Sequence, residues 1–169
     1  MKRFSMVIGA SVALVVAGCS TAPVALAPVG PNPASGRERM SAAGELQVFS
    51  RWEEESDNQN QGSTDPVWHQ HADYKVYDAH GKLLLRVDNT TGHYEPAPRR
   101  VALPPGQYLV RVPAQGYLQV DVPVTIERGR LTRVHLDEKW KLPPATPRTE
   151  VVSTPNGQPV GWNAFLTKE

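Results

Sequence analysis

The strongest constraint on the fold is an alternation of apolar and polar side chains in residues 118–126. Every second residue of this segment is a large aliphatic one: Leu118, Val120, Val122, Val124 and Ile126. A period of two places these side chains on one face of a β-strand, whereas an amphipathic helix has a period of 3.6. Pro123 lies inside the run and has no backbone N–H to donate. We therefore predict a strand that either lies at a sheet edge or carries a bulge.

Six further segments have the composition or the alternation of short strands. They are residues 46–52, 73–78, 82–88, 99–103, 108–112 and 132–136. Turn-forming residues separate them, and Asp78-Ala79-His80-Gly81 predicts a tight hairpin turn. No segment after residue 18 shows the apolar period of a helix. We expect an all-β protein, with a single immunoglobulin-like antiparallel sandwich of about seven strands.

The N-terminus has the features of a bacterial export signal. Lys2 and Arg3 precede an apolar run in residues 6–17, which is shorter than the roughly 20 residues that a membrane-spanning helix needs. The run leads into Val16-Ala17-Gly18-Cys19, which resembles the lipobox of bacterial lipoproteins. The resemblance implies that residues 1–18 are removed. The alternative is an ordinary secretory signal followed by an incidental thiol.

The same resemblance assigns Cys19 as the lipidation site, with a covalent diacylglycerol and acyl chains that anchor the protein in a membrane. Cys19 is the only cysteine of the chain, so an intramolecular disulfide is impossible and the exported domain must be stable through its core. Ser20 follows, where an aspartate would favour retention in the inner membrane. We therefore expect the protein to be anchored in the cell outer membrane.

Charge excludes one class of partner. Without Lys2 and Arg3, sixteen Lys and Arg residues face seventeen Asp and Glu residues, so the mature chain is close to neutral. Nucleic-acid binding requires a strong basic field, and we expect none here.

Proline content divides the chain into four parts. They are the signal peptide (1–18), a Pro/Ala-rich tether (19–44), the β-sandwich domain (45–140) and a Pro-rich C-terminal tail (141–169). We expect the tether and the tail to be disordered flanks. However, Trp162 and Phe165 give the tail an apolar patch, which predicts that this part docks on the domain or on a partner.

A turn of the form Leu-Pro-x-Gly-x-Tyr occupies residues 103–108, and Gly116-Tyr117 follows it. Residues 122–136 then read as a hairpin with a threonine-containing last strand. This pattern resembles the carboxypeptidase-regulatory-like, PEGA and Cna-B group of transthyretin-like sandwiches. The resemblance implies a spacer, stalk or adhesive module of the cell envelope and not an enzyme.

The best candidate for site chemistry is the segment that contains His69, His71 and Asp73. In a strand these three side chains project to one face, and two imidazoles with a carboxylate are ligands for zinc or copper. The alternative is a solvated loop that leads into a strand. The serines are weaker candidates for a catalytic site, because Ser50, Ser56 and Ser63 lack the flanking glycines of a nucleophile elbow. We expect no catalytic residue and no cofactor besides the lipid.

A polar loop, residues 53–66, lies between Trp52 and Trp68 and is either a solvated excursion or a rim that binds glycan or protein. Two functional hypotheses result. The first is a lipid-anchored, non-catalytic interaction or structural module, with a membrane, an envelope protein or peptidoglycan as its partner. The second is a periplasmic metal-binding or carrier protein that uses His69, His71 and Asp73.

Overall fold

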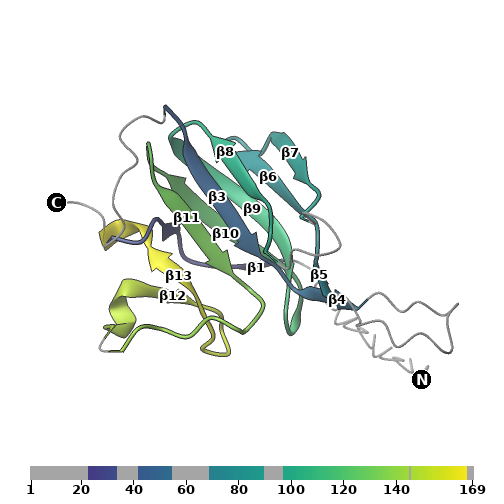
Figure 1. Ribbon diagram of the computed structural model, residues 1–169, viewed down its shortest axis with the longest axis vertical. Helices are drawn as coiled ribbons and strands as arrows, with labels where there is room; N and C mark the ends of the chain where they lie inside the picture. The colour runs from purple at the N-terminus through teal and green to yellow at the C-terminus, as the bar shows by residue number, and fades with distance from the viewer. Residues whose placement is uncertain (1–22, 34–41, 55–68, 90–96, 145, 167–169) are drawn as a thin grey trace, which may run out of the picture.

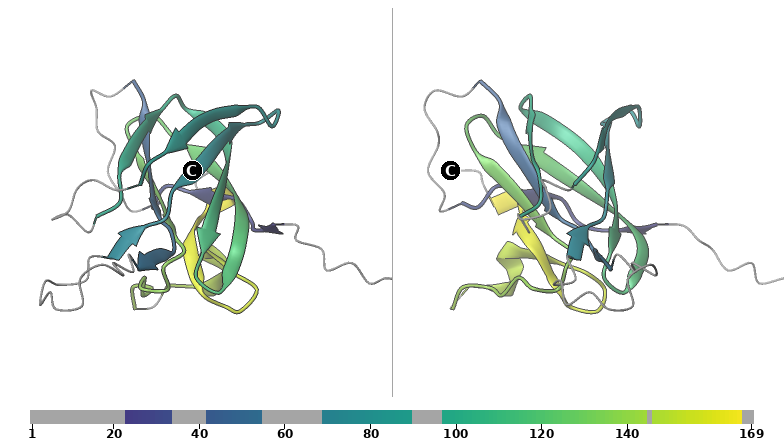
Figure 2. Two further views of the ribbon diagram at one scale, coloured as in Figure 1. Left: turned by 90° about the vertical axis from the view of Figure 1, so that its right-hand side faces the viewer. Right: turned by 45° about the vertical axis from the view of Figure 1, so that its right-hand side comes forward.

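The computed structural model describes residues 23–33, 42–54, 69–89, 97–144 and 146–166, with only the backbone at positions 54, 69, 70 and 166. The prediction of an all-β protein is confirmed: two sheets pack face to face, as Figures 1 and 2 show. Two short 3-10 turns, η1 (Arg148–Glu150) and η2 (Ala164–Leu166), are the helical elements of the described residues. None of the helices in this part of the chain has the length and apolar character needed to cross a bilayer.

The larger sheet has eight strands. Seven of them follow one another across the sheet in the order β12 (Val151–Ser153), β13 (Pro159–Asn163), β2 (Val29–Gly30), β10 (Tyr117–Ile126), β9 (Gly106–Ala114), β6 (Tyr74–Asp78) and β7 (Leu83–Val87). The eighth, β1 (Val24–Ala25), pairs with β10 on the same side as β2.

The second sheet has three strands in the order β11 (Leu131–His135), β3 (Gly44–Phe49) and β8 (Arg100–Leu103). A separate hairpin of β4 (Trp52–Glu54) and β5 (His69–His71) extends from one end of the sandwich. Most neighbours are antiparallel, but β1 and β2 run parallel to β10, and β11 runs parallel to β3. The sandwich is therefore mixed where the sequence predicted an antiparallel one.

Aliphatic side chains from both sheets form one core. β10 contributes its even-numbered residues, from Val120 to Ile126, all at most 2 % exposed. Leu46 and Val48 of β3 and Val134 of β11 meet them from the other layer and are fully buried. Alternation along each strand thus separates a dry interior from a polar exterior.

All seven strands predicted from the sequence are present. The predicted alternation fails at one residue, Leu118, whose side chain is 76 % exposed. The pairing of β10 with β9 shifts register between Tyr117 and Val120, and such a bulge turns a side chain away from its regular face. The predicted hairpin turn is also present, since the Gly81 N–H donates to the Asp78 carbonyl at 3.1 Å.

Pro123 lies in an internal strand, and its missing donor has a local explanation. The Asp121 carbonyl accepts a hydrogen bond from the Leu26 N–H at 2.9 Å, so the odd-numbered residues of β10 direct their backbone polar groups towards β1 and β2. Pro123 lies opposite the gap between these two strands, where no ladder hydrogen bond is required.

Two segments that the sequence placed in the disordered flanks add strands to the larger sheet. β1 and β2 come from the predicted tether, and β12 and β13 come from the predicted tail. Val29 and Val160 are fully buried and Val152 is 3 % exposed, so these short strands complete the core. The prediction that the tail docks on the domain is confirmed for Trp162, which lies in β13 opposite Gly30.

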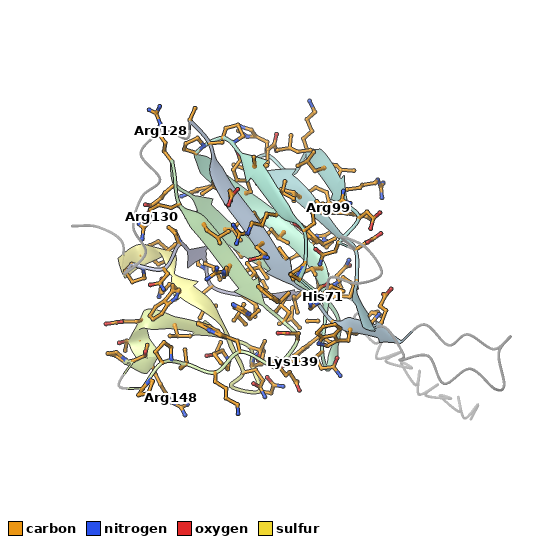
Figure 3. The ribbon with its side chains drawn as sticks, viewed as in Figure 1. His71, Arg99, Arg128, Arg130, Lys139 and Arg148 are labelled. Atoms are coloured by element: carbon orange, nitrogen blue, oxygen red, sulfur yellow. The ribbon has the colours of Figure 1, made fainter. Side chains whose placement is uncertain are left out.

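A buried arginine ties the first of these segments to the sandwich. The Arg130 side chain is 5 % exposed, and its guanidinium donates to the Glu127 carboxylate at 2.6 Å. The same guanidinium donates to the Asn32 carbonyl, 98 residues earlier in the chain. This contact holds the residues that follow β2 against the β10–β11 turn (Figure 3).

Candidate functional site

His71, one of the three predicted metal ligands, is held inside the protein by the β4–β5 hairpin. It pairs with Trp52 across the hairpin and is 5 % exposed. Its Nδ1 lies 2.8 Å from the Ser50 carbonyl oxygen. Because a carbonyl can only accept, Nδ1 carries the proton in this contact. Burial lowers the pKa of His71 below 6.5, more than this hydrogen bond raises it, so the ring is neutral at pH 7.

Of the other two predicted ligands, the structure describes the side chain of Asp73. β5 ends at His71, and Asp73 lies beyond it with an exposed side chain whose Oδ1 accepts from the Asn89 N–H at 3.0 Å. The side chain of His69 is outside the described residues. Among the side chains that are described, no three His, Cys, Asp or Glu residues are grouped closely enough to hold a metal ion. The metal site stays a prediction.

Ser50 belongs to a buried polar network beside His71. Its hydroxyl is fully buried and donates to the Ala72 carbonyl at 2.6 Å. The Asn89 Nδ2 donates to the same hydroxyl at 3.1 Å and to the Val48 carbonyl at 2.9 Å. These bonds connect the end of β3, the end of β5 and the residues after β7. The network therefore holds these three segments together, and the Ser50 hydroxyl is not accessible to solvent.

A row of contacting aromatic rings runs from Trp52 and His71 across the outside of the smaller sheet. We call the following six residues the aromatic row: Trp52, His71, Phe49, His135, Trp140 and Trp162. The central part is the most regular: Phe49 stacks on His135 with centroids 4.4 Å apart, and His135 stacks on Trp140 at 4.8 Å. Both pairs have interplanar angles of 16°. Trp140 then meets Trp162 edge to face at 6.2 Å.

Strand register and one turn position these rings. Phe49 and His135 are direct partners in the parallel pair of β3 and β11, and both side chains point away from the core because their neighbours Val48 and Val134 point into it. The chain then turns through Glu138, which has a positive φ of 59°. Beyond the turn, Trp140 covers His135, and the Lys139 ammonium lies 3.7 Å from the centroid of the Trp52 ring.

Both histidines of the row are neutral at pH 7. Burial, and to a smaller extent the positive charge of Arg133, lowers the pKa of His135 to about 4. The six rings of the aromatic row therefore carry no charge at pH 7. The positive charge near them comes from neighbouring residues such as Lys139.

An open cleft lies beside the far end of the row. It has a volume of about 290 Å³ and lies between the segment after β11 and the β12–β13 hairpin. Its lining residues are Trp140, Lys141, Leu142, Arg148, Val151, Ser153, Gly157 and Pro159. Lys141 and Arg148 are exposed, and none of the described residues that line the cleft is acidic. Figure 3 shows Arg148 beside β12, on the opposite side of the molecule from Arg128.

An indole with two nearby cations is suited to a ligand that combines an apolar or sugar face with carboxylate or phosphate groups. Sugar rings and alkyl groups stack on indole, and guanidinium and ammonium groups bind anions. The sequence did not indicate this combination, because Trp140, Arg148 and Trp162 lie at or beyond the predicted end of the domain. The one available signal was the apolar patch in a tail that was expected to be disordered.

Two predicted features lie outside the described residues. Cys19 is one, and the greater part of the predicted loop rim, including Trp68, is the other. Of the rim, the structure describes Trp52, which joins the aromatic row.

Comparison of the chain with family models, with curated proteins and with solved structures finds no match. The resemblance to transthyretin-like envelope modules stays a prediction.

Proposed function

We propose that this protein is a lipid-anchored, non-catalytic binding module of the bacterial cell envelope, anchored in the outer membrane through Cys19, and that it binds peptidoglycan. The observation that carries the proposal is the cleft beside Trp140, whose described lining combines an indole with two exposed cations and contains no acidic residue. The lipobox-like sequence supports the location, since a module anchored there meets the cell wall.

Peptidoglycan fits the cleft chemically. Its strands present sugar faces that stack on an aromatic ring, and its peptide stems carry free carboxylates. In the proposed complex a sugar or lactyl face lies on the Trp140 indole, and a carboxylate lies between Lys141 and Arg148. Because both cations are exposed, we expect binding to weaken as ionic strength rises.

The row behind the cleft supports this role by holding Trp140 in place. Trp140 is stacked on His135 and braced at its edge by Trp162, so its ring is oriented before a ligand arrives. A preformed orientation reduces the entropy that binding would otherwise cost.

The test is co-sedimentation of the mature, unlipidated protein with purified peptidoglycan. The double variant Lys141→Glu/Arg148→Glu reverses both cleft charges at exposed positions. We expect it to bind about tenfold more weakly or worse, because two charge-assisted contacts become repulsive.

The matched control is Lys82→Glu/Arg86→Glu, which makes the same change of charge at exposed positions of the β6–β7 hairpin. This control should bind like the wild type. Equal losses in both double variants would indicate a general charge effect, and no sedimentation of the wild type would reject peptidoglycan as the ligand.

A further inference from the structure

We propose that one end of the sandwich rests on the lipid bilayer that carries the anchor, with Leu118 inserted into its interface. This inference depends on the proposed lipidation of Cys19. The sequence alone predicted a tether of 26 residues, 19–44, which would lift the domain off the membrane. The structure leaves much less free chain than that.

The pairing of β1 sets the distance between the domain and the anchor. Val24 lies beside Val120 in the sheet. Val24 is only five positions after Cys19, and even a fully extended chain of five steps reaches only about 18 Å. The acylated N-terminus therefore starts close to the early part of β10. A lipid anchor on so short a lead holds that end of the sandwich at the membrane surface.

Leu118 lies at that end and has the exposure that insertion requires. It precedes Val120 by two residues on β10, which is about 7 Å along the strand. Among the large hydrophobic side chains described as exposed, it is the most exposed, at 76 %. The bulge between Tyr117 and Val120 turns it away from the core, and no other part of the described chain covers it. An aliphatic side chain presented in this way gains from transfer into the acyl region.

The surroundings of Leu118 suit a bilayer without requiring anionic lipid. The turn between β9 and β10 and the residues after it, positions 114–119, carry no charged side chain. The described charges farther from Leu118 at this end form no basic patch: Arg51 pairs with Glu53 at 3.6 Å, and Asp73, Asp88 and Glu138 are exposed carboxylates. The half-buried Tyr117 is an aromatic residue of the kind that favours the interface.

Phe165 provides an internal comparison at the other end. It is nearly as exposed as Leu118, at 72 %, and it follows Asn163, which pairs with Val29. Val29 pairs in turn with Val124, six residues along β10 from Leu118, or about 20 Å. Exposure alone predicts that both residues enter the membrane. The short lead from Cys19 predicts that Leu118 does so and that Phe165 stays in water.

The experiment places an environment-sensitive NBD fluorophore at each position of the full-length lipidated protein. Cys19 is the only natural cysteine and its sulfur is blocked by the lipid, so Leu118→Cys or Phe165→Cys gives a single labelling site. The labelled proteins are reconstituted into vesicles of phosphatidylethanolamine and phosphatidylglycerol, with or without spin-labelled lipid. We expect blue-shifted emission and several-fold stronger quenching at position 118 than at position 165, at low and at high salt.

Three results would overturn the inference, and they are distinguishable. A purified protein whose mass shows no acyl group would reject the anchor, and with it the proposed location as well as this orientation. An acylated protein whose label at 118 stays in water would reject the orientation alone. Stronger quenching at 165 than at 118 would indicate the reverse orientation and would also leave the anchor in place.

Discussion

His135 couples the stability of the fold to pH because its ring is stacked between Phe49 and Trp140. Its pKa is about 4 in the folded protein and 6.5 in the unfolded chain. Between pH 4 and pH 6.5 the unfolded state therefore binds a proton at His135 that the folded state does not bind. Neutral His135 therefore contributes fully to the free energy of unfolding above pH 6.5. This contribution is lost as pH falls, by up to about 3 kcal/mol near pH 4.

This predicts that His135→Phe keeps the stacked row and flattens the pH dependence. We expect the free energy of unfolding of the wild type to fall more steeply between pH 6.5 and 4.5 than that of the variant, measured by urea unfolding with tryptophan fluorescence. Carboxylates and His71 contribute to both slopes, so the difference between the two proteins isolates His135. Parallel slopes would show that His135 titrates normally and is not buried in the row.

At the scale of elements, the period of two predicted the seven central strands, because half-buried strands must alternate. Leu118 fits the same alternation but points outwards, because it lies at a bulge. The bulge depends on the pairing with β9, so the alternation of residues does not reveal it. The strands β2 and β13 were missed for a different reason. β2 has only two residues, and Pro159 and Gly161 interrupt the alternation of β13, so only their pairing with other strands identifies them as strands.

The position of β13 can be tested at Gly161. A Cβ there would lie 2.5 Å from the Val29 Cγ1 and 2.9 Å from the Arg133 carbonyl oxygen, and neither contact is possible without displacing a strand. We therefore expect Gly161→Ala to lower the free energy of unfolding by about 2 kcal/mol. Gly106→Ala is the matched control, because its Cβ would meet Tyr108 no closer than 3.6 Å, and we expect a change within about 0.5 kcal/mol. If the two variants were equally stable, β13 would not pack against β2 as described.

At the scale of the whole molecule, the candidate site combines residues that only the fold brings together. Phe49 and His135 are 86 positions apart and meet through the parallel pairing of β3 and β11. Trp162 reaches Trp140 because β13 joins the larger sheet. The envelope location stays a prediction, and the all-β fold class could be predicted from the sequence, since it depends on local alternation. The site could not, because its geometry depends on strand order.

We propose that the cleft between Trp140 and the β12–β13 hairpin contacts peptidoglycan in the cell. The first measurement to make is photo-crosslinking in intact cells, with a photo-reactive amino acid in place of the exposed Ser153 at the cleft, or of the exposed Leu84 on β7 as the control, and with adducts identified by mass spectrometry. We expect muropeptide adducts from position 153 and none from position 84. Muropeptide adducts in equal amounts from both positions, or their absence from position 153, would reject peptidoglycan binding at the cleft.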